Sequence, residues 1–121
     1  NGIRAKLISP ELCVVEAELS DTTNNPLGYA HGGMIYSVCD VAAGILVRAA
    51  GCLSVTLSGN INYLRPTLGK SLRAEARIIK SGKTVFLVET NVYNDEDVHT
   101  ARGEFQFYVL EDYRKAAVNQ H

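Results

Sequence analysis

The chain has 121 residues, the length of one ordinary domain, so a second folded unit is not expected. Its 46% hydrophobic and 21% charged residues are typical of a globular protein and exclude a disordered or collagen-like chain. Lys and Arg number 12 against 13 Asp and Glu, so the formal net charge of −1 provides no overall attraction to nucleic acid or to an anionic membrane.

The cysteines are Cys13, Cys39 and Cys52, an odd number without a C-x-x-C pair. This pattern predicts neither a disulfide framework nor a zinc site, and it indicates a reducing compartment such as the cytoplasm. The longest apolar stretch, residues 34–50, contains two charged residues and is shorter than the ~20 residues that span a bilayer. We therefore expect no membrane helix, and no signal-peptide pattern opens the sequence.

In chain order, the first predicted elements are two strands, Ile3–Ile8 and Leu12–Leu19, which are separated by a proline turn and can pair. A polar loop is predicted at 21–26. From residue 32 to about residue 50, apolar residues recur at steps of three and four, which predicts a helix that ends at Gly51. Its opposite side is also small or apolar, so we expect other structure to cover the helix nearly all round.

The second half of the chain predicts four strands with short connections, which favours an antiparallel sheet. The fold class is therefore α+β, with one curved sheet of about six strands around a single long central helix. We expect one domain over residues 1–110 and a polar tail over residues 111–121. The four predicted strands are 55–63, 72–78, 85–93 and 103–110.

The start of the helix is the first candidate site. His31 lies there, directly before Gly32 and Gly33, whereas His99 and His121 are interpreted as surface residues. A helix N-terminus has unpaired N–H groups and a partial positive charge, and the two glycines leave those groups uncovered. An oxyanion hole for acyl transfer needs this arrangement, but a tight entry into the helix uses the same glycines, so both interpretations stay open.

Asp40 is a carboxylate in the middle of the apolar helix, where an unpaired charge costs several kcal/mol. It lies about 10 Å from Gly33 along the helix axis, at 1.5 Å per residue, so one helix cannot bring both to a single carbonyl group. If Asp40 acts with the helix start, the two come from different subunits of a two-fold dimer with antiparallel helices. Ser37 and Cys39 are poor nucleophile candidates, since no histidine lies within reach along the helix. No set of His, Asp and Glu has the spacing of metal ligands.

Two segments, 69–71 and 82–84, imitate the end of a phosphate-binding loop, but the earlier glycine is absent and a strand follows each. We interpret both as hairpin turns. The segment Lys80–Lys83, together with Arg65, offers cations to a phosphorylated ligand, although solvated turn lysines are the simpler interpretation.

The stretch from Asn25 to Met34, followed by Asp40 and by Val55–Pro66, resembles the hotdog-fold acyl-CoA thioesterases. Within them it is most similar to the phenylacetate-pathway and thioesterase-superfamily-member-2 type. The likeness runs from about Ile3 to Leu110, and its N-x5-H-G-G-x6-D spacing is fairly specific. The resemblance implies a hotdog fold and hydrolysis of an aryl- or medium-chain acyl-CoA, with no cofactor beyond the coenzyme A of the substrate.

The resemblance also implies roles for particular residues. The backbone N–H of Gly32 polarises the thioester carbonyl, and His31 and Asn25 shape that end of the site. Asp40 of the partner subunit acts as general base or as nucleophile, and Thr56 positions the water. The resemblance further implies a homodimer for the active site and a homotetramer of two dimers. The residues expected to bind substrate or CoA are Gly33, Tyr36, Arg65, Lys80, Ser81 and Lys83.

Two alternatives come from the same fold. A non-catalytic acyl-CoA sensor keeps the groove, but sensors usually lack the catalytic acid and carry a DNA-binding segment, whereas this chain has Asp40 and no helix-turn-helix. A hotdog dehydratase is expected to have a His and a Glu in a different motif, and this sequence does not contain that motif.

Overall fold

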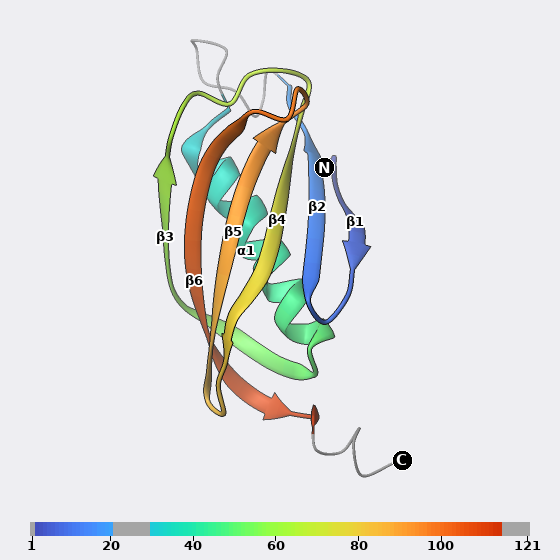
Figure 1. Cartoon of the computed structure of the whole chain (residues 1–121), viewed down its shortest axis with the longest axis vertical. Coiled ribbons are helices and arrows are strands. Elements are labelled where there is room, and N and C mark those ends of the chain that lie inside the picture. Colours follow the sequence, from blue (N-terminus) through green and yellow to red (C-terminus); the bar gives the residue numbers. More distant parts are fainter. Residues whose placement is uncertain (1, 21–29, 115–121) are drawn as a thin grey trace.

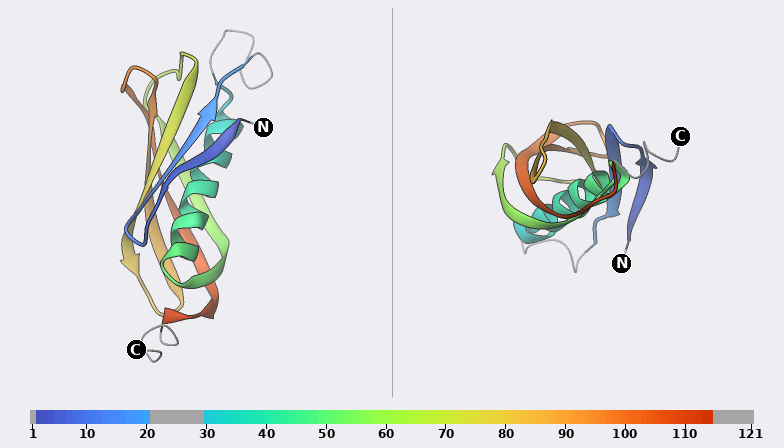
Figure 2. Two further views of the ribbon diagram at one scale, coloured as in Figure 1. Left: turned by 90° about the vertical axis from the view of Figure 1, so that its right-hand side faces the viewer. Right: turned by 90° about the horizontal axis from the view of Figure 1, so that it is seen from below.

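The computed structural model describes residues 2–20 and 30–114. Its six strands form one antiparallel sheet in the order β1-β2-β4-β5-β6-β3, and the sheet curls around a single helix (Figures 1 and 2). The predicted α+β architecture is confirmed. The elements are β1 (Ile3–Ile8), β2 (Leu12–Glu18), α1 (Gly32–Ala49), β3 (Cys52–Tyr63), β4 (Ser71–Ser81), β5 (Val85–Asn94) and β6 (His99–Asp112).

Strands β3 and β6 are longer than their sequence pattern predicts. They pair from Cys52 opposite Asp112 to Tyr63 opposite Ala101, so each strand continues as far as the other can supply hydrogen bonds. Their additional end residues include Cys52, Thr100 and Ala101, which are buried but lie in stretches too short or too mixed for apolar alternation to identify.

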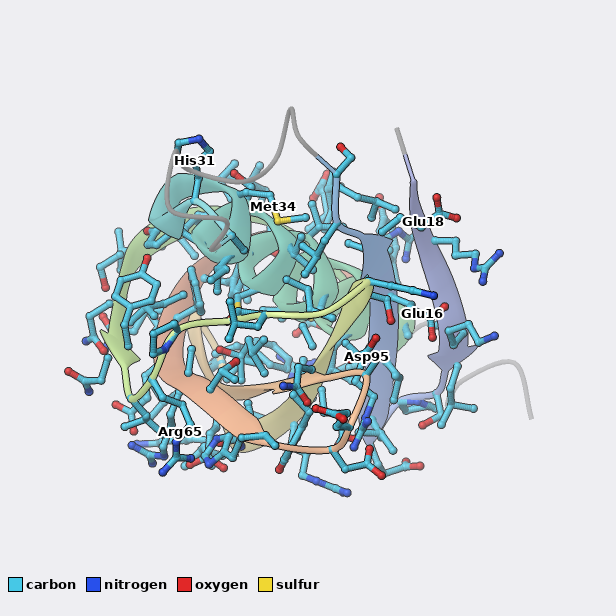
Figure 3. The ribbon with its side chains drawn as sticks, turned by 90° about the horizontal axis from the view of Figure 1, so that it is seen from above. Glu16, Glu18, His31, Met34, Arg65 and Asp95 are labelled. Atoms are coloured by element: carbon cyan, nitrogen blue, oxygen red, sulfur yellow. The ribbon has the colours of Figure 1, made fainter. Side chains whose placement is uncertain are left out.

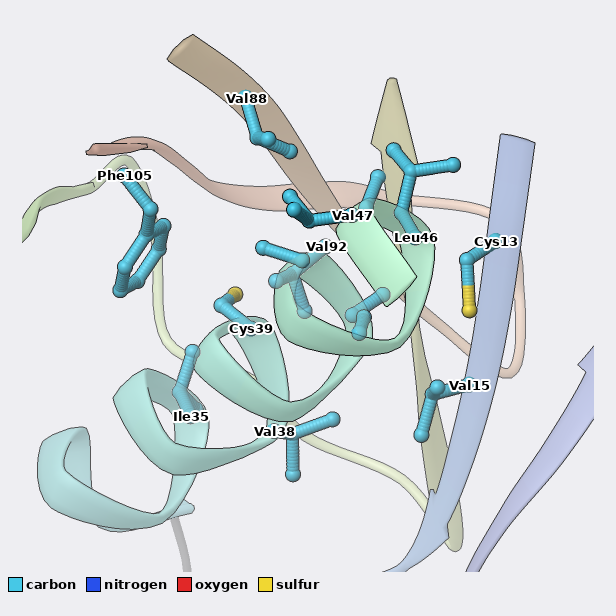
Figure 4. Close-up of a cluster of buried hydrophobic side chains, with 14 of the residues drawn as sticks. Cys13, Val15, Ile35, Val38, Cys39, Leu46, Val47, Val88, Val92 and Phe105 are labelled. Atoms are coloured by element: carbon cyan, nitrogen blue, oxygen red, sulfur yellow. The ribbon is translucent and has the colours of Figure 1, made fainter. Parts of the chain in front are cut away.

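The core lies between α1 and the concave side of the sheet. Every second residue of β5 is buried, as expected for a strand with one face on the core. Figure 4 shows how side chains of α1, among them Val38 and Leu46, meet Val15 of β2 and Val88 and Val92 of β5. By length and composition, α1 is the one helix in the described part of the chain that can cross a membrane, but its buried residues form this core.

The expectation that other structure covers α1 nearly all round is wrong for a single chain. The sheet covers one side of the helix, and a stripe on the other side is exposed at Gly33, Ser37, Val41 and Arg48. Val41 keeps 41% of its surface accessible. The apolar pattern correctly identified residues that avoid water, but this chain supplies no cover for all of them.

Strand β3 is one edge of the sheet, with β6 as its only partner strand in the described residues. Residues 55–58 in its middle are all exposed, including Val55 at 48% and Leu57 at 56%. An edge strand has a row of backbone N–H and C=O groups without partners, and exposed apolar side chains increase its tendency to pair with another strand.

Candidate active site

Asp40 and Thr56 lie next to each other, one on α1 and the other on β3. The Thr56 hydroxyl Oγ1 donates a hydrogen bond to Asp40 Oδ1 over 2.8 Å. No ion pair among the described residues involves Asp40, and its side chain is half-buried. The carboxylate therefore has one fixed oxygen, held by Thr56, and a second oxygen that is available to a ligand or to water.

A groove begins at this pair and continues between α1 and β3. Its volume is about 460 Å³, and its walls are mainly apolar. Gly44 widens the groove, because the nearest atom to a Cβ at this position is a ring carbon of Phe107, 3.7 Å away. Arg48 lies at the far end, with its guanidinium 5.4 Å from the centre of the Tyr113 ring. The remaining lining residues are Val41, Ile45, Cys52, Leu53, Ser54 and Val55.

The start of α1 has the uncovered backbone that the two glycines predict. His31 is the N-cap residue in an extended conformation, and its side chain makes no capping hydrogen bond. The first helical bond runs from the N–H of Ile35 to the carbonyl of His31, so the N–H groups of Gly32 and Gly33 have no acceptor within residues 2–20 and 30–114. A Cβ on Gly33 would meet no described atom within 4 Å. As far as the described residues go, these amides are therefore open to an incoming anionic or carbonyl oxygen.

A second cavity, of about 430 Å³, lies beside the helix start, between α1 and the β3–β4 connection. Tyr63, the last residue of β3, forms part of its wall and donates a hydrogen bond from its hydroxyl to the Gly32 carbonyl oxygen over 2.8 Å. The sequence analysis did not single out Tyr63, because nothing local marks a strand residue that contacts a helix start 31 positions earlier. The other lining residues are Ala30, Gly32, Ile35, Leu64, Arg65, Pro66 and Thr67.

Arg65 lines the same cavity as Gly32, beside the helix start. In Figure 3 the His31 ring points away from the core. The Arg65 Nη1 donates to the backbone carbonyl of His99. His99 itself is half-buried, with Nε2 at 2.8 Å from Asn91 Oδ1 and its ring stacked on Tyr93. Asn25, another residue expected at this end, lies outside the described residues.

The β4–β5 hairpin lies at the opposite end of the molecule from the start of α1 (Figure 1). Lys80 and Lys83 are exposed there and form no ion pair among the described residues. Ser81 is less available, because Arg114 Nη1 donates to its hydroxyl over 2.7 Å while Arg114 Nη2 donates to the Gly82 carbonyl. Arg114 also pairs with Asp112, and this contact holds the pKa of that carboxyl well below its usual range.

Both segments that imitate phosphate loops lead into strands, as predicted, and residues 82–84 form the predicted hairpin turn between β4 and β5. The prediction of a hairpin turn at 69–71 is wrong, because β3 pairs with β6 and not with β4. Residues 69–71 enter β4 and residues 82–84 enter β5. Gly69 has a φ of 112°, a left-handed conformation that favours glycine, and Asp95 Oδ2 accepts a hydrogen bond from the next backbone N–H, that of Lys70.

Tyr36 and Cys39 both face the interior. The Tyr36 ring packs edge-on against Phe105, with 5.1 Å between ring centres, and it lines neither of the two cavities beside α1. Burial raises the pKa of the Cys39 thiol to about 11, so the thiol stays protonated at neutral pH. A packing role for Cys39 is therefore favoured over a nucleophilic one. In the described part of the chain, no group of three or more His, Cys, Asp or Glu side chains is arranged to hold a metal ion.

Within one chain, the structure brings together two separate groups of predicted site residues. One group is Asp40 with Thr56, and the other is His31 with Gly32 and Gly33. Gly33 and Asp40 are seven positions apart, which keeps the groups about 10 Å apart along the helix. The hairpin lysines form a third group at the far end of the molecule.

Comparison with known proteins identifies relatives of this chain in sequence and in structure. Residues 27–101 match the model of the family described as "Thioesterase superfamily". Acyl-coenzyme A thioesterase 13 of Mus musculus is 27% identical over 89 residues, which cover 71% of this chain and 64% of the mouse protein. The medium/long-chain acyl-CoA thioesterase YigI of Escherichia coli is 25% identical over 95 residues, covering 65% of this chain and 61% of that protein. The chain therefore spans less than two thirds of the length of either relative.

A solved structure is similar over nearly its full length. It is a Streptococcus mutans protein whose crystal structure contains acetyl-CoA, with a TM-score of 0.86 and 29% sequence identity. The similarity covers 93% of this chain and 91% of that protein.

Proposed function

Since the chain belongs to the thioesterase superfamily and has its hotdog fold, we propose that it hydrolyses the thioester bond of an acyl-CoA to the free acid and coenzyme A. The observation that carries this proposal is the half-buried Asp40 carboxylate, oriented by Thr56 at the mouth of an apolar groove. Mouse and E. coli relatives that are named as acyl-CoA thioesterases, and a similar structure with acetyl-CoA bound, support the substrate class.

The active site of this proposal is shared between two copies of the chain. Two copies are needed because Gly32 and Asp40 lie too far apart along α1. An oxyanion donor at Gly32 and a base at Asp40 of the same helix cannot meet at one carbonyl group. The exposed edge of β3 and the open stripe of α1 provide a self-complementary surface for a two-fold partner. Antiparallel pairing of β3 with its copy puts Asp40 of one protomer near Gly32 of the other.

The same two-fold arrangement gives the hairpin lysines a role. The two-fold rotation makes the long axes of the two copies antiparallel. The β4–β5 hairpin of one copy therefore approaches the helix-start end of the other. Lys80 and Lys83 then supply positive charge for the phosphates of coenzyme A, and Arg65 adds a cation from the helix-start end. A homotetramer of two such dimers completes the proposal, on the basis of the family resemblance.

The chemistry follows from these groups. The thioester oxygen accepts hydrogen bonds at the positive start of α1, beginning with the N–H of Gly32, where negative charge develops during the attack. Asp40 takes a proton from water as the water oxygen bonds to the carbonyl carbon, and it returns the proton to the sulfur when the C–S bond breaks. His31 and Asn25 shape the oxyanion end of the site. A direct attack by Asp40, which forms an acyl anhydride, is the alternative route.

Labelled water separates the two routes. In a single turnover with excess enzyme in H₂¹⁸O, the general-base route places one ¹⁸O atom from the attacking water in the acid product. The anhydride route delivers an unlabelled oxygen from Asp40 first if water attacks the aspartyl carbon, and ¹⁸O then appears in the enzyme.

The groove between α1 and β3 supports an aryl or medium-chain acyl group. Its walls are apolar, and from Asp40 to Arg48 it is about 12 Å long at 1.5 Å per helical residue. Burial of a hydrocarbon chain there is favourable by about 25 cal/mol per Å². A negatively charged acyl group has no positively charged partner in the described walls apart from Arg48 at the far end.

The direct test is thiol release from a panel of acyl-CoAs by the purified protein and by its Asp40→Asn variant. We expect progressive release by the parent and a rate about 10²–10⁴-fold lower in the variant, because a general base contributes that much. Release by the variant at the parental rate contradicts the assignment of Asp40. Tight binding of acyl-CoA without any release by the parent instead identifies a non-catalytic sensor.

The compartment is also part of the proposal. The cysteines Cys13, Cys39 and Cys52 are all buried and free, which fits a reducing environment such as the cytoplasm.

A further inference from the structure

The two glycines at the start of α1 have different surroundings. A Cβ on Gly32 would lie 3.2 Å from the hydroxyl oxygen of Tyr63 and 3.3 Å from the ring carbon that carries it. A Cβ on Gly33 would meet no atom of residues 2–20 and 30–114 within 4 Å. Glycine at position 32 therefore makes room for Tyr63, whereas position 33 has no crowding neighbour in this part of the chain.

Tyr63 holds the peptide group that joins the two glycines. Its hydroxyl donates to the Gly32 carbonyl oxygen over 2.8 Å. Because a peptide group is planar, fixing this oxygen also fixes the direction of the Gly33 N–H on the other side of the same plane. A carbonyl that accepts a hydrogen bond also becomes more polarised, which strengthens its N–H as a donor.

In addition to its helical hydrogen bond, the Gly32 carbonyl oxygen accepts one side-chain hydrogen bond from the described residues, that of Tyr63. The N-cap side chain of His31 makes no capping hydrogen bond, and the first turn of α1 contains no acidic residue. A helix end without a cap frays easily, since its first N–H groups lack internal partners. Burial raises the pKa of Tyr63, so its hydroxyl keeps the donated proton throughout the neutral range.

We propose that Tyr63 is a positioning residue for hydrolysis: it orients the Gly32–Gly33 peptide so that the Gly33 N–H becomes a second donor to the thioester oxygen. This inference rests on the proposed thioesterase function. Tyr63 acts through the backbone of the helix start and takes no proton in the reaction.

The first test is kinetic and compares Tyr63→Phe with the parent. The variant keeps the ring against Gly32 and removes only the hydroxyl. Loss of one neutral hydrogen bond predicts a kcat lower by about 2–12-fold, with KM for acyl-CoA unchanged, because the bond matters most when charge develops on the oxygen. Tyr108→Phe is the matched control, since Tyr108 is an exposed residue of β6, and it should keep the parental kcat. A parental kcat in Tyr63→Phe, or a change confined to KM, overturns the inference.

The second test measures polarisation of the bound carbonyl. An acyl-CoA with a ¹³C-labelled thioester carbonyl is bound to Asp40→Asn, and its stretching band is recorded by difference infrared spectroscopy with and without Tyr63→Phe. We expect the bound band below its frequency in water, and a shift back toward that frequency when the hydroxyl is absent. A purely structural role for Tyr63 would lower thermal stability without moving this band, and an unmoved band overturns the inference.

The two proposals fail in different ways. If the parent binds acyl-CoA but releases no thiol, the thioesterase function is wrong, whatever Tyr63 does. If the parent is active and Tyr63→Phe equals it in kcat and in the carbonyl band, only the role of Tyr63 is wrong.

Discussion

The Thr56 hydroxyl donates to the Asp40 carboxylate over 2.8 Å, and this bond connects the edge strand β3 to the middle of α1. It orients one carboxylate oxygen and leaves the other available.

The Asp40–Thr56 pair predicts the effect of two substitutions at position 56. Thr56→Val keeps the shape of the side chain and removes the hydroxyl, so the carboxylate loses its orientation and thiol release should slow by about tenfold or more. Thr56→Ser keeps the hydroxyl and should stay within about threefold of the parent. Steady-state kinetics on one acyl-CoA measures both, and equal rates for the Val and Ser variants contradict an orienting role.

The proposed shared site predicts that two inactive variants restore each other. Asp40→Asn removes the proposed base, and Gly33→Val blocks the approach to the helix start, where a side chain meets no atom of the described residues within 4 Å. A mixed dimer has one site with both defects and one site with neither, so mixing after mild denaturation and refolding should recover part of the parental activity. Activity no higher than the sum of the two separate variants contradicts the shared site.

The proposed pairing of β3 with its copy predicts that a charge on this exposed edge separates the two copies. Leu57→Lys puts a charge at a residue that is 56% exposed in the single chain, so the fold itself should survive. We expect a lower mass by light scattering and loss of hydrolysis together. A matched charge on the other edge, Leu7→Lys in β1, should leave the dimer and its activity intact. An active monomer would contradict the proposed arrangement.

Gly59 predicts a large loss of stability. A Cβ at this position would lie 2.6 Å from both a ring carbon of Phe105 and the hydroxyl oxygen of Tyr36. Because these rings pack against each other, Gly59→Ala should lower the free energy of unfolding by about 1–3 kcal/mol. Gly44→Ala is the control, since its Cβ would have ordinary contact at 3.7 Å and alanine favours a helix. Urea denaturation measures both, and equal stability of the two variants would contradict the crowding at Gly59.

The hairpin lysines predict a change in recognition of the nucleotide part of coenzyme A. Lys83→Gln and Lys80→Gln, combined, should raise KM for acyl-CoA several-fold, since each exposed charge contributes up to about 1 kcal/mol. KM for the matching acyl-pantetheine, which lacks the nucleotide, should not change. Lys6→Gln in β1 is the control for charge alone. Equal effects on both substrates would exclude a contact with the nucleotide.

Cys39 predicts part of the alkaline pH dependence of stability. Burial raises the pKa of its thiol from 9.0 to about 11, so between these values the folded chain keeps a proton that the unfolded chain releases. The free energy of unfolding therefore decreases as the pH rises from about 9 to about 11, by up to about 2–3 kcal/mol from this group. Cys39→Ala should lower stability at pH 7 and flatten this slope in urea denaturation. An unchanged slope would contradict the shifted thiol.

The sequence by itself determined the elements, because helix and strand periodicity depend on residues that are neighbours along the chain. It also identified Asp40, a carboxylate whose cost in an apolar helix is visible without coordinates, and the glycines at the helix start. It did not reveal the contacts of Tyr63 with Gly32, of Gly59 with Tyr36 or of Arg114 with Ser81, which join residues more than 20 positions apart.

Only the tertiary structure decided those contacts, since they depend on the register of β3 against β6 and on the position of α1 against the concave face of the sheet. It also decided which side of α1 the chain covers. The hydrophobic pattern indicates only that a side chain avoids water. Burial by the sheet of the same chain and burial by another molecule have the same transfer free energy, so the pattern does not distinguish them. For that reason the apolar stripe through Val41 looked the same in the sequence as the core around Val38, and only the folded chain distinguishes them.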